Sequence, residues 1–276
     1  MDGRKNAMVT GAGRGLGYGI AEELILAGYD VVLHYNSSAA GTEELIALAE
    51  SKGQKAWAYQ ADIRETENIT KMFDLVEENV GGLDLFVNNS GITRMSKILE
   101  PDEEMFEDVY RTNLKGAYFC VSQAGNNMKR HKIQGSIAII GSNHLACVWG
   151  RNSVYAMFKL ALSKFTQHAA MEFSKYRIRV NMVAPGYVGI PYSARKNTAM
   201  LITEEQWEER KQRIYHNEIP LGRFIPRNEV GQIILFLASP AAASITGITL
   251  IADGGAHLLH GDPKMHNYFQ PEEDEE

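Results

Sequence analysis

Short apolar runs alternate with longer segments of helical period along almost the whole chain. The runs are rich in β-branched and aromatic residues, and they begin near residues 7, 31, 55, 83, 136, 177 and 248. The segments between them have the apolar spacing of helices, over 17–28, 40–52, 66–80, 102–130, 153–175 and parts of 200–238. Repeated strand–helix–strand units predict an α/β fold with a doubly wound, seven-stranded parallel sheet and helices on both faces.

The domain organisation follows from the absence of an internal linker. No stretch rich in Pro, Gly or Ser divides the chain, so residues 1–256 are expected to form one domain. The segment 189–217 is long and polar, as expected of a lid over a substrate site. Residues 257–276 are expected to form a C-terminal extension with an acidic tail, because the chain ends in PEEDEE.

Charge and cysteine content exclude several classes of partner. The net charge is −6, but the last five residues are all acidic, so the rest of the chain is close to neutral. We therefore expect small-molecule partners and no binding of nucleic acid or of a membrane surface. No apolar run approaches the roughly 20 residues of a membrane helix, and no secretory leader is evident at the N-terminus. Cys120 and Cys147 form neither a disulfide framework nor a zinc motif, which suits the cytoplasm and predicts no bound metal.

A glycine-rich turn follows the first apolar run and leads directly into a predicted helix. It reads TGAGRGLG at 10–17, in which Gly11, Gly15 and Gly17 allow a tight turn and a close approach to a pyrophosphate. The general GxGxxG spacing does not fit this stretch in any register. The position of the turn favours a dinucleotide-binding Rossmann domain over a simple strand-to-helix connection.

The end of the second run distinguishes the two nicotinamide cofactors. An acidic residue there accepts hydrogen bonds from a free ribose 2′-hydroxyl and repels a 2′-phosphate. This chain has Asn36, Ser37 and Ser38 instead, and Arg14 lies in the glycine-rich turn. These residues predict that NADP(H) is preferred and that NAD(H) is possible. The alternative is that Arg14 is solvated beside a polar turn.

A tyrosine and a lysine share one face of the helix predicted over 153–175. Tyr155 and Lys159 are four residues apart, so the phenol and the ammonium are neighbours. A phenol that works near neutral pH needs about 3–4 kcal/mol of phenolate stabilisation, which a nearby cation supplies. Ser142 follows the apolar run at 136–141 and is therefore expected at the same edge of the sheet.

Together these residues resemble the short-chain dehydrogenases/reductases. The resemblance covers residues 5 to about 256 and rests on TGAGRGLG at 10–17, Asp62, NNSG at 88–91, Asn113, Ser142, YAMFK at 155–159, PG at 185–186 and ADGG at 252–255. It implies that Tyr155 is the acid/base and that Ser142 orients the substrate carbonyl. It also implies that Lys159 binds the nicotinamide ribose and lowers the pKa of the phenol, and that Asn113 holds a water molecule in a proton relay.

The resemblance also implies a set of cofactor contacts at the glycine-rich turn and the strand ends. The set comprises Gly11, Arg14, Gly15, Leu16, Gly17, Asn36, Ser37, Ser38, Asp62, Ile63, Asn89, Ser90, Gly91, Tyr155, Lys159, Pro185, Gly186 and Val188. Three residues depart from the usual pattern of the family: Ser90 replaces an alanine, Ile190 a threonine, and Phe158 a serine or alanine. None of the three replaces a catalytic residue.

The substrate is less constrained than the reaction. GSNHLACVW at 141–149 and IPY at 190–192 are most similar to bacterial glucose 1-dehydrogenases, so His144 and Tyr192 are expected to contact the substrate. His144 packing against the lid is the alternative. GITR at 91–94 and MKRHK at 128–132 resemble instead the 3-oxoacyl carrier-protein reductases, whose cations receive an acidic protein.

Two further functional interpretations and the oligomeric state stay open. A hydroxysteroid substrate would need an apolar pocket, for which four residues are candidates: Met95, Trp149, Tyr187 and Tyr192. The alternative is that these side chains are ordinary core residues. A catalytically idle dinucleotide-binding sensor is disfavoured, because Asn113, Ser142, Tyr155 and Lys159 occur together. The family resemblance predicts a homo-oligomer, most simply a tetramer. Small or apolar residues on several faces of the helix over 153–175 support it: Ala161, Phe165, Ala169 and Met171.

Overall fold

The computed structural model describes residues 5–190 and 203–259. Its main sheet has seven parallel strands in the order β3-β2-β1-β4-β5-β6-β9, which confirms the predicted doubly wound sheet. The strands are β1 (Asn6–Thr10), β2 (Asp30–Tyr35), β3 (Ala56–Gln60), β4 (Leu85–Asn88), β5 (Ser136–Ile140), β6 (Arg179–Pro185) and β9 (Thr249–Ala252). The chain moves outward from β1 to β3 and then returns to place β4 beside β1. A crevice is expected at the carboxyl ends of β1 and β4, where this order reverses.

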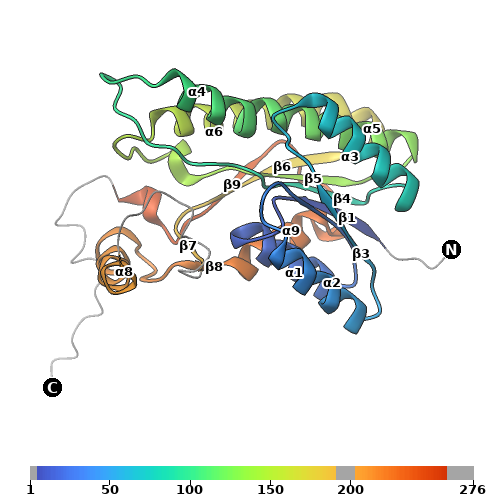
Figure 1. The fold of residues 1–276 in the computed structure, drawn as a ribbon, viewed down its shortest axis with the longest axis horizontal. Coiled ribbons are helices and arrows are strands. Elements are labelled where there is room, and N and C mark those ends of the chain that lie inside the picture. Colours follow the sequence, from blue (N-terminus) through green and yellow to red (C-terminus); the bar gives the residue numbers. More distant parts are fainter. Residues whose placement is uncertain (1–4, 191–202, 260–276) are drawn as a thin grey trace.

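Helices cover both faces of the sheet (Figure 1). They are α1 (Gly15–Leu26), α2 (Ala40–Ser51), α3 (Thr66–Asn79), α4 (Glu103–Val109), α5 (Ala117–Arg130), α6 (Ser153–Phe173), α8 (Glu204–Glu218) and α9 (Arg227–Ala238). Figure 1 shows α3, α4, α5 and α6 above the sheet and α1, α2 and α9 below it. None of the helices in the described ranges is long and apolar enough to cross a membrane.

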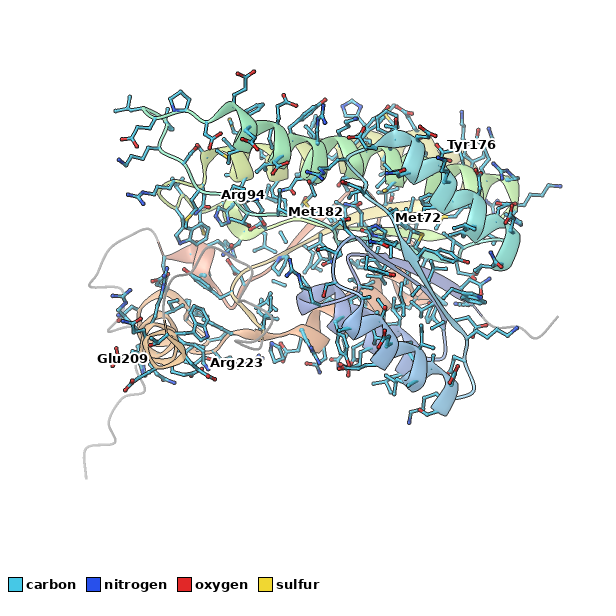
Figure 2. The ribbon with its side chains drawn as sticks, in the orientation of Figure 1. Met72, Arg94, Tyr176, Met182, Glu209 and Arg223 are labelled. Carbon is cyan, nitrogen blue, oxygen red and sulfur yellow. The ribbon has the colours of Figure 1, made fainter. Side chains whose placement is uncertain are left out.

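Two apolar cores hold these layers together. Met72 of α3 and Met182 of β6 belong to the upper core, between the sheet and the helices above it (Figure 2). Leu24 of α1 and Ile234 of α9 belong to the lower core. Strands buried on both faces need apolar side chains on both, which is why β1, β4 and β5 read as continuous apolar runs rather than alternating ones.

The helix predicted over 102–130 differs from a single regular helix. A π-helical segment, Tyr110–Gly116, separates α4 from α5. The wider turn is invisible to an analysis of helical period, because it changes the spacing of only one turn. Asn113 is buried inside this segment.

The region predicted as a polar lid, 189–217, contains a helix in its second part. A capping box starts α8: the Thr203 side chain accepts from the Gln206 backbone, and the Gln206 side chain accepts from the Thr203 backbone. Trp207 and Ile214 of α8 form a small separate core. A two-stranded ribbon of β7 (Val188–Gly189) and β8 (Ile225–Pro226) lies beside it and was not predicted, since two residues give no period.

Candidate active site

A cleft of about 640 Å³ opens at the carboxyl ends of the strands. Every residue that the sequence predicted to contact the cofactor lines this cleft, and Ser142 lines it too. These residues lie on or just after β1, β2, β3, β4, β6 and α6, so the fold brings together segments that are far apart in the sequence.

The glycine-rich turn forms one wall of the cleft. Gly15 has φ +60°, which a side chain disfavours, and a Cβ on Gly17 would overlap the carbonyl oxygen of Gly11. No side chain caps the first turn of α1, and that turn carries no acidic residue. The amides and the positive end of the helix dipole therefore face the cleft without a side-chain anion, which fits the pyrophosphate of a dinucleotide.

Neighbouring strands fix the position of this turn. The Asn89 side chain donates to the Thr10 carbonyl at 2.9 Å, and the Asn89 backbone donates to the Thr10 hydroxyl at 2.9 Å. The Gly11 amide donates to Nδ1 of His34 at 3.2 Å. Burial lowers the pKa of His34, so its ring is neutral and Nδ1 can accept.

One end of the cleft carries the side chains of Arg14, Arg64 and Asp62. Arg14 and Ser37 are exposed in the cleft, and Ser38 is half-buried there. The guanidinium of Arg64 donates to both carboxylate oxygens of Asp62, at 2.6–3.1 Å, and lowers the pKa of that carboxyl. Arg64 was not predicted as a site residue; its only signal in the sequence is its position two residues after Asp62.

Lys159 and Tyr155 lie side by side on α6 at the other end of the cleft. The ammonium of Lys159 donates to the Ile140 carbonyl at 2.7 Å and lies 5.7 Å from the centroid of the Tyr155 ring. Lys159 is 3% exposed, and this burial lowers its pKa to about 8. The lysine therefore still carries its charge beside the phenol at neutral pH.

The phenol of Tyr155 has two hydroxyl partners. Burial raises the pKa of Tyr155, whereas hydrogen bonds with Ser142 and Thr93 act in the opposite direction without reversing the shift. In the chain without cofactor the phenol is thus protonated at neutral pH and can act as an acid. Thr93 was not predicted as a site residue; its signal was the GITR stretch at 91–94.

Asn113 lies behind the cleft rather than in its lining. Its side-chain oxygen accepts from the Ile92 amide and its side-chain nitrogen donates to the Ile92 carbonyl, both at 2.8 Å. The side-chain amide of Asn113 is therefore engaged by the backbone of Ile92. The relay remains a prediction.

The predicted substrate contacts are only partly described. His144 approaches Ser142 and Tyr155 but does not line the cleft, so its direct contact with substrate remains a prediction. Tyr192 lies outside the described residues. Tyr187 does line the cleft, and its hydroxyl donates to the Glu218 carboxylate at 2.5 Å.

Comparison with known proteins gives matches over nearly the whole chain. Residues 11–257 match a family model described as enoyl-(acyl carrier protein) reductase. The 3-oxoacyl-[acyl-carrier-protein] reductase FabG of Staphylococcus aureus is 33% identical over 256 residues, covering 92% of this chain and 98% of the relative. The 3beta-hydroxysteroid dehydrogenase 1 of Eggerthella lenta is 31% identical over 257 residues, covering 93% and 95%. The solved structure of acetoin dehydrogenase YohF from Salmonella typhimurium has a TM-score of 0.83 and 25% identity, covering 94% and 98%.

Proposed function

Because the chain belongs to the short-chain dehydrogenase/reductase family of oxidoreductases, we propose that it uses NADP(H) to interconvert a secondary alcohol or sugar hemiacetal with its carbonyl compound or lactone. The observation that carries this proposal is the meeting of Ser142, Tyr155 and Lys159 in one cleft with an uncapped helix N-terminus. The three side chains suit proton transfer to or from a substrate oxygen atom, and the helix N-terminus suits the cofactor phosphates.

The proposed chemistry divides between the cofactor and the chain. The nicotinamide, when bound, gives or takes the hydride. In the reducing direction the Tyr155 hydroxyl gives its proton to the substrate oxygen, and in the oxidising direction the phenolate takes it back. Ser142 donates a hydrogen bond to the same oxygen. The positive charge of Lys159 favours the phenolate form of Tyr155, and its ammonium group contacts the nicotinamide ribose.

The proposed preference for NADP(H) rests on the polar end of β2. Asn36, Ser37 and Ser38 line the cleft with Arg14, and none of these residues carries a negative charge. The neighbouring carboxylate of Asp62 is engaged by Arg64. A 2′-phosphate therefore meets a cation and hydroxyl donors without a free carboxylate. NAD(H) would lose the charge-assisted contact.

We propose a glucose 1-dehydrogenase-like substrate, a neutral polyhydroxy compound, on the resemblance of the 141–149 and 190–192 stretches. Reduction of a 3-oxoacyl carrier-protein thioester is the second candidate, and the Staphylococcus aureus relative bears that name. A basic pocket of about 250 Å³ favours it, lined in part by Lys129, Lys132, Lys175 and Arg177 around Tyr176.

That basic pocket lies away from the cleft. Its residues precede β5 and β6, whereas the cleft residues follow the strands. Figure 2 shows Tyr176 of the pocket at the upper right and Arg94 of the cleft well to the left of it. This geometry is why the carrier-protein candidate ranks second.

We also propose a homo-oligomer, most simply a tetramer, in the cytoplasm. Of the four residues predicted to support it, Met171 is exposed, whereas Ala169 is buried and Phe165 packs on the upper core. Other apolar side chains of α5 and α6 are exposed and take their place: Tyr118, Phe119, Met157 and Leu160. Both cysteines are free thiols, which suits a reducing compartment.

A substrate panel tests the proposed function. Purified protein is assayed with NADPH or NADP⁺ and with glucose and other sugars, hydroxysteroids, and 3-oxoacyl thioesters on a carrier protein and on coenzyme A. We expect turnover on sugars, followed by the absorbance of the reduced nicotinamide. Turnover restricted to carrier-protein thioesters or steroids would support those alternatives. Cofactor binding without any turnover would support the idle sensor.

A further inference from the structure

The hydroxyl of Ser142 has two neighbours from one residue, His144. Nδ1 of the His144 ring lies 2.9 Å from the Ser142 oxygen. The His144 backbone amide donates to the same oxygen at 3.4 Å. A serine hydroxyl has two lone pairs and a single proton, so these two contacts determine what it can still offer to a substrate.

The protonation state of the His144 ring decides whether Nδ1 donates to the Ser142 oxygen or accepts from it. Burial and the charge of Lys159 lower the pKa of His144 to about 4, so the ring is neutral and carries a single N–H at neutral pH. The ring is held between Trp149, with centroids 4.3 Å apart, and Tyr155, with centroids 5.1 Å apart. Packing therefore sets the position of the ring, and the tautomer decides which of its nitrogens carries the proton.

The other ring nitrogen identifies the tautomer. Nε2 is buried and has no hydrogen-bond partner among the described residues. A buried N–H without a partner is rarer in proteins than a buried acceptor without one. The proton is therefore better placed on Nδ1, where the Ser142 oxygen accepts it.

We propose that His144 is a positioning residue: its Nδ1–H and backbone N–H fill both lone pairs of Ser142, so that the serine proton can only point at Tyr155 and the reacting substrate oxygen. In the opposite tautomer, Nδ1 would accept a hydrogen bond from the Ser142 hydroxyl. Ser142 could then no longer donate a hydrogen bond to a substrate carbonyl. This inference rests on the proposed reaction at Ser142 and Tyr155. It gives His144 a role that does not require contact with substrate.

Three substitutions separate the two ring nitrogens. His144→Asn keeps a donor near the position of Nδ1, His144→Gln keeps a polar group near that of Nε2, and His144→Phe keeps the stacked ring without either nitrogen. For each, kcat, the substrate KM, the cofactor Kd and the thermal unfolding midpoint are measured. We expect Asn to retain most of the wild-type kcat. Gln and Phe should lower kcat by about 3- to 10-fold, the effect of one neutral hydrogen bond, with the cofactor Kd unchanged.

Other orders of activity overturn the inference. If Gln retains activity and Asn does not, His144 acts through Nε2 on the substrate. If Phe retains the wild-type kcat, neither nitrogen matters. Failure of the proposed function is distinguishable, because the wild type itself would then show no turnover.

A second readout does not depend on turnover. The tautomer is read from ¹⁵N resonances of histidine-labelled protein, with the His144 signals assigned by their loss in His144→Phe. We expect the proton on Nδ1 at neutral pH. A proton on Nε2 would overturn the proposal whatever the kinetics show.

Discussion

The ammonium of Lys159 is tied to the carbonyl oxygen of Ile140 by a hydrogen bond of 2.7 Å. Ile140 is the last residue of β5, and Ser142 follows it after one residue, so the same strand end positions the cation and the serine. Tyr155 lies one turn before Lys159 on α6, which brings the phenol to this group. This arrangement buries the positive charge of Lys159, which lowers the free energy of unfolding.

Lys159→Met should therefore stabilise the protein at neutral pH. Burial lowers the pKa of Lys159 from 10.5 to about 8, so below pH 8 the folded state holds an unfavourable charge that the unfolded state does not penalise. The variant should gain up to about 3 kcal/mol in free energy of unfolding at pH 7. Above pH 8 the folded wild type loses the proton first, so this advantage should shrink and vanish near pH 10.5. Denaturant titrations at several pH values measure it; an advantage independent of pH would contradict the assignment.

The contact between Tyr187 and Glu218 should control the substrate end of the cleft. Tyr187 lines the cleft, stacks on Phe224 and joins α8 to the cleft through its 2.5 Å hydrogen bond. Tyr187→Phe should lower the free energy of unfolding by about 1 kcal/mol and raise the substrate KM, with the cofactor Kd unchanged. Glu209→Gln, on the exposed face of α8, is the matched control (Figure 2). An unchanged KM would mean that α8 does not act on the substrate site.

The proposed oligomer depends on the apolar surface of α5 and α6. Leu160 of α6 is 58% exposed, and a charge there would be buried unpaired in an interface. Leu160→Asp should reduce the assembly to smaller species in light scattering. Leu75→Asp, at a 41% exposed position on α3, should leave the assembly intact. A wild-type protein with the mass of one chain at micromolar concentration would contradict the proposal.

Cofactor preference should follow Arg14. A charge-assisted hydrogen bond to the 2′-phosphate contributes roughly 1.5–3 kcal/mol, or about 10- to 150-fold in affinity. Arg14→Ala should remove most of the preference for NADPH, and Asn36→Asp should reverse it by repelling the phosphate. The control is Lys71→Ala, at an exposed cation of α3 outside the cleft, which should leave the preference for NADPH as it is in the wild type. Equal kcat/KM values for NADPH and NADH in the wild type would contradict this interpretation.

The fold was predictable from the sequence because its signals are local or repetitive. Each strand of the main sheet is an apolar run, so the runs predict the strands and their ends. The cofactor contacts were predicted mainly from the family resemblance, and the residues named lie along one cleft. The β7–β8 ribbon and the π-helical turn around Asn113 escaped prediction, because neither has a repeating pattern.

The electrostatics and side-chain contacts of the site were less predictable. The pairing of Arg64 with Asp62 and the approach of Thr93 to Tyr155 depend on rotamers and on loops that meet only in the folded chain. The approach of His144 to Ser142 depends on the same factors, and its contact with substrate stays a prediction. The residue types were visible in the sequence, but their partners were not.

In the proposed reaction, Tyr155 transfers the proton while hydride moves to or from the cofactor. Tyr155→Phe removes only the hydroxyl, so the most direct measurement is kcat of this variant beside its cofactor Kd, on the substrate that the panel identifies. Tyr176→Phe, remote from the cleft, serves as the control. We expect Tyr155→Phe to lose about 100- to 10,000-fold in kcat with cofactor binding intact. A kcat close to that of the wild type would contradict it.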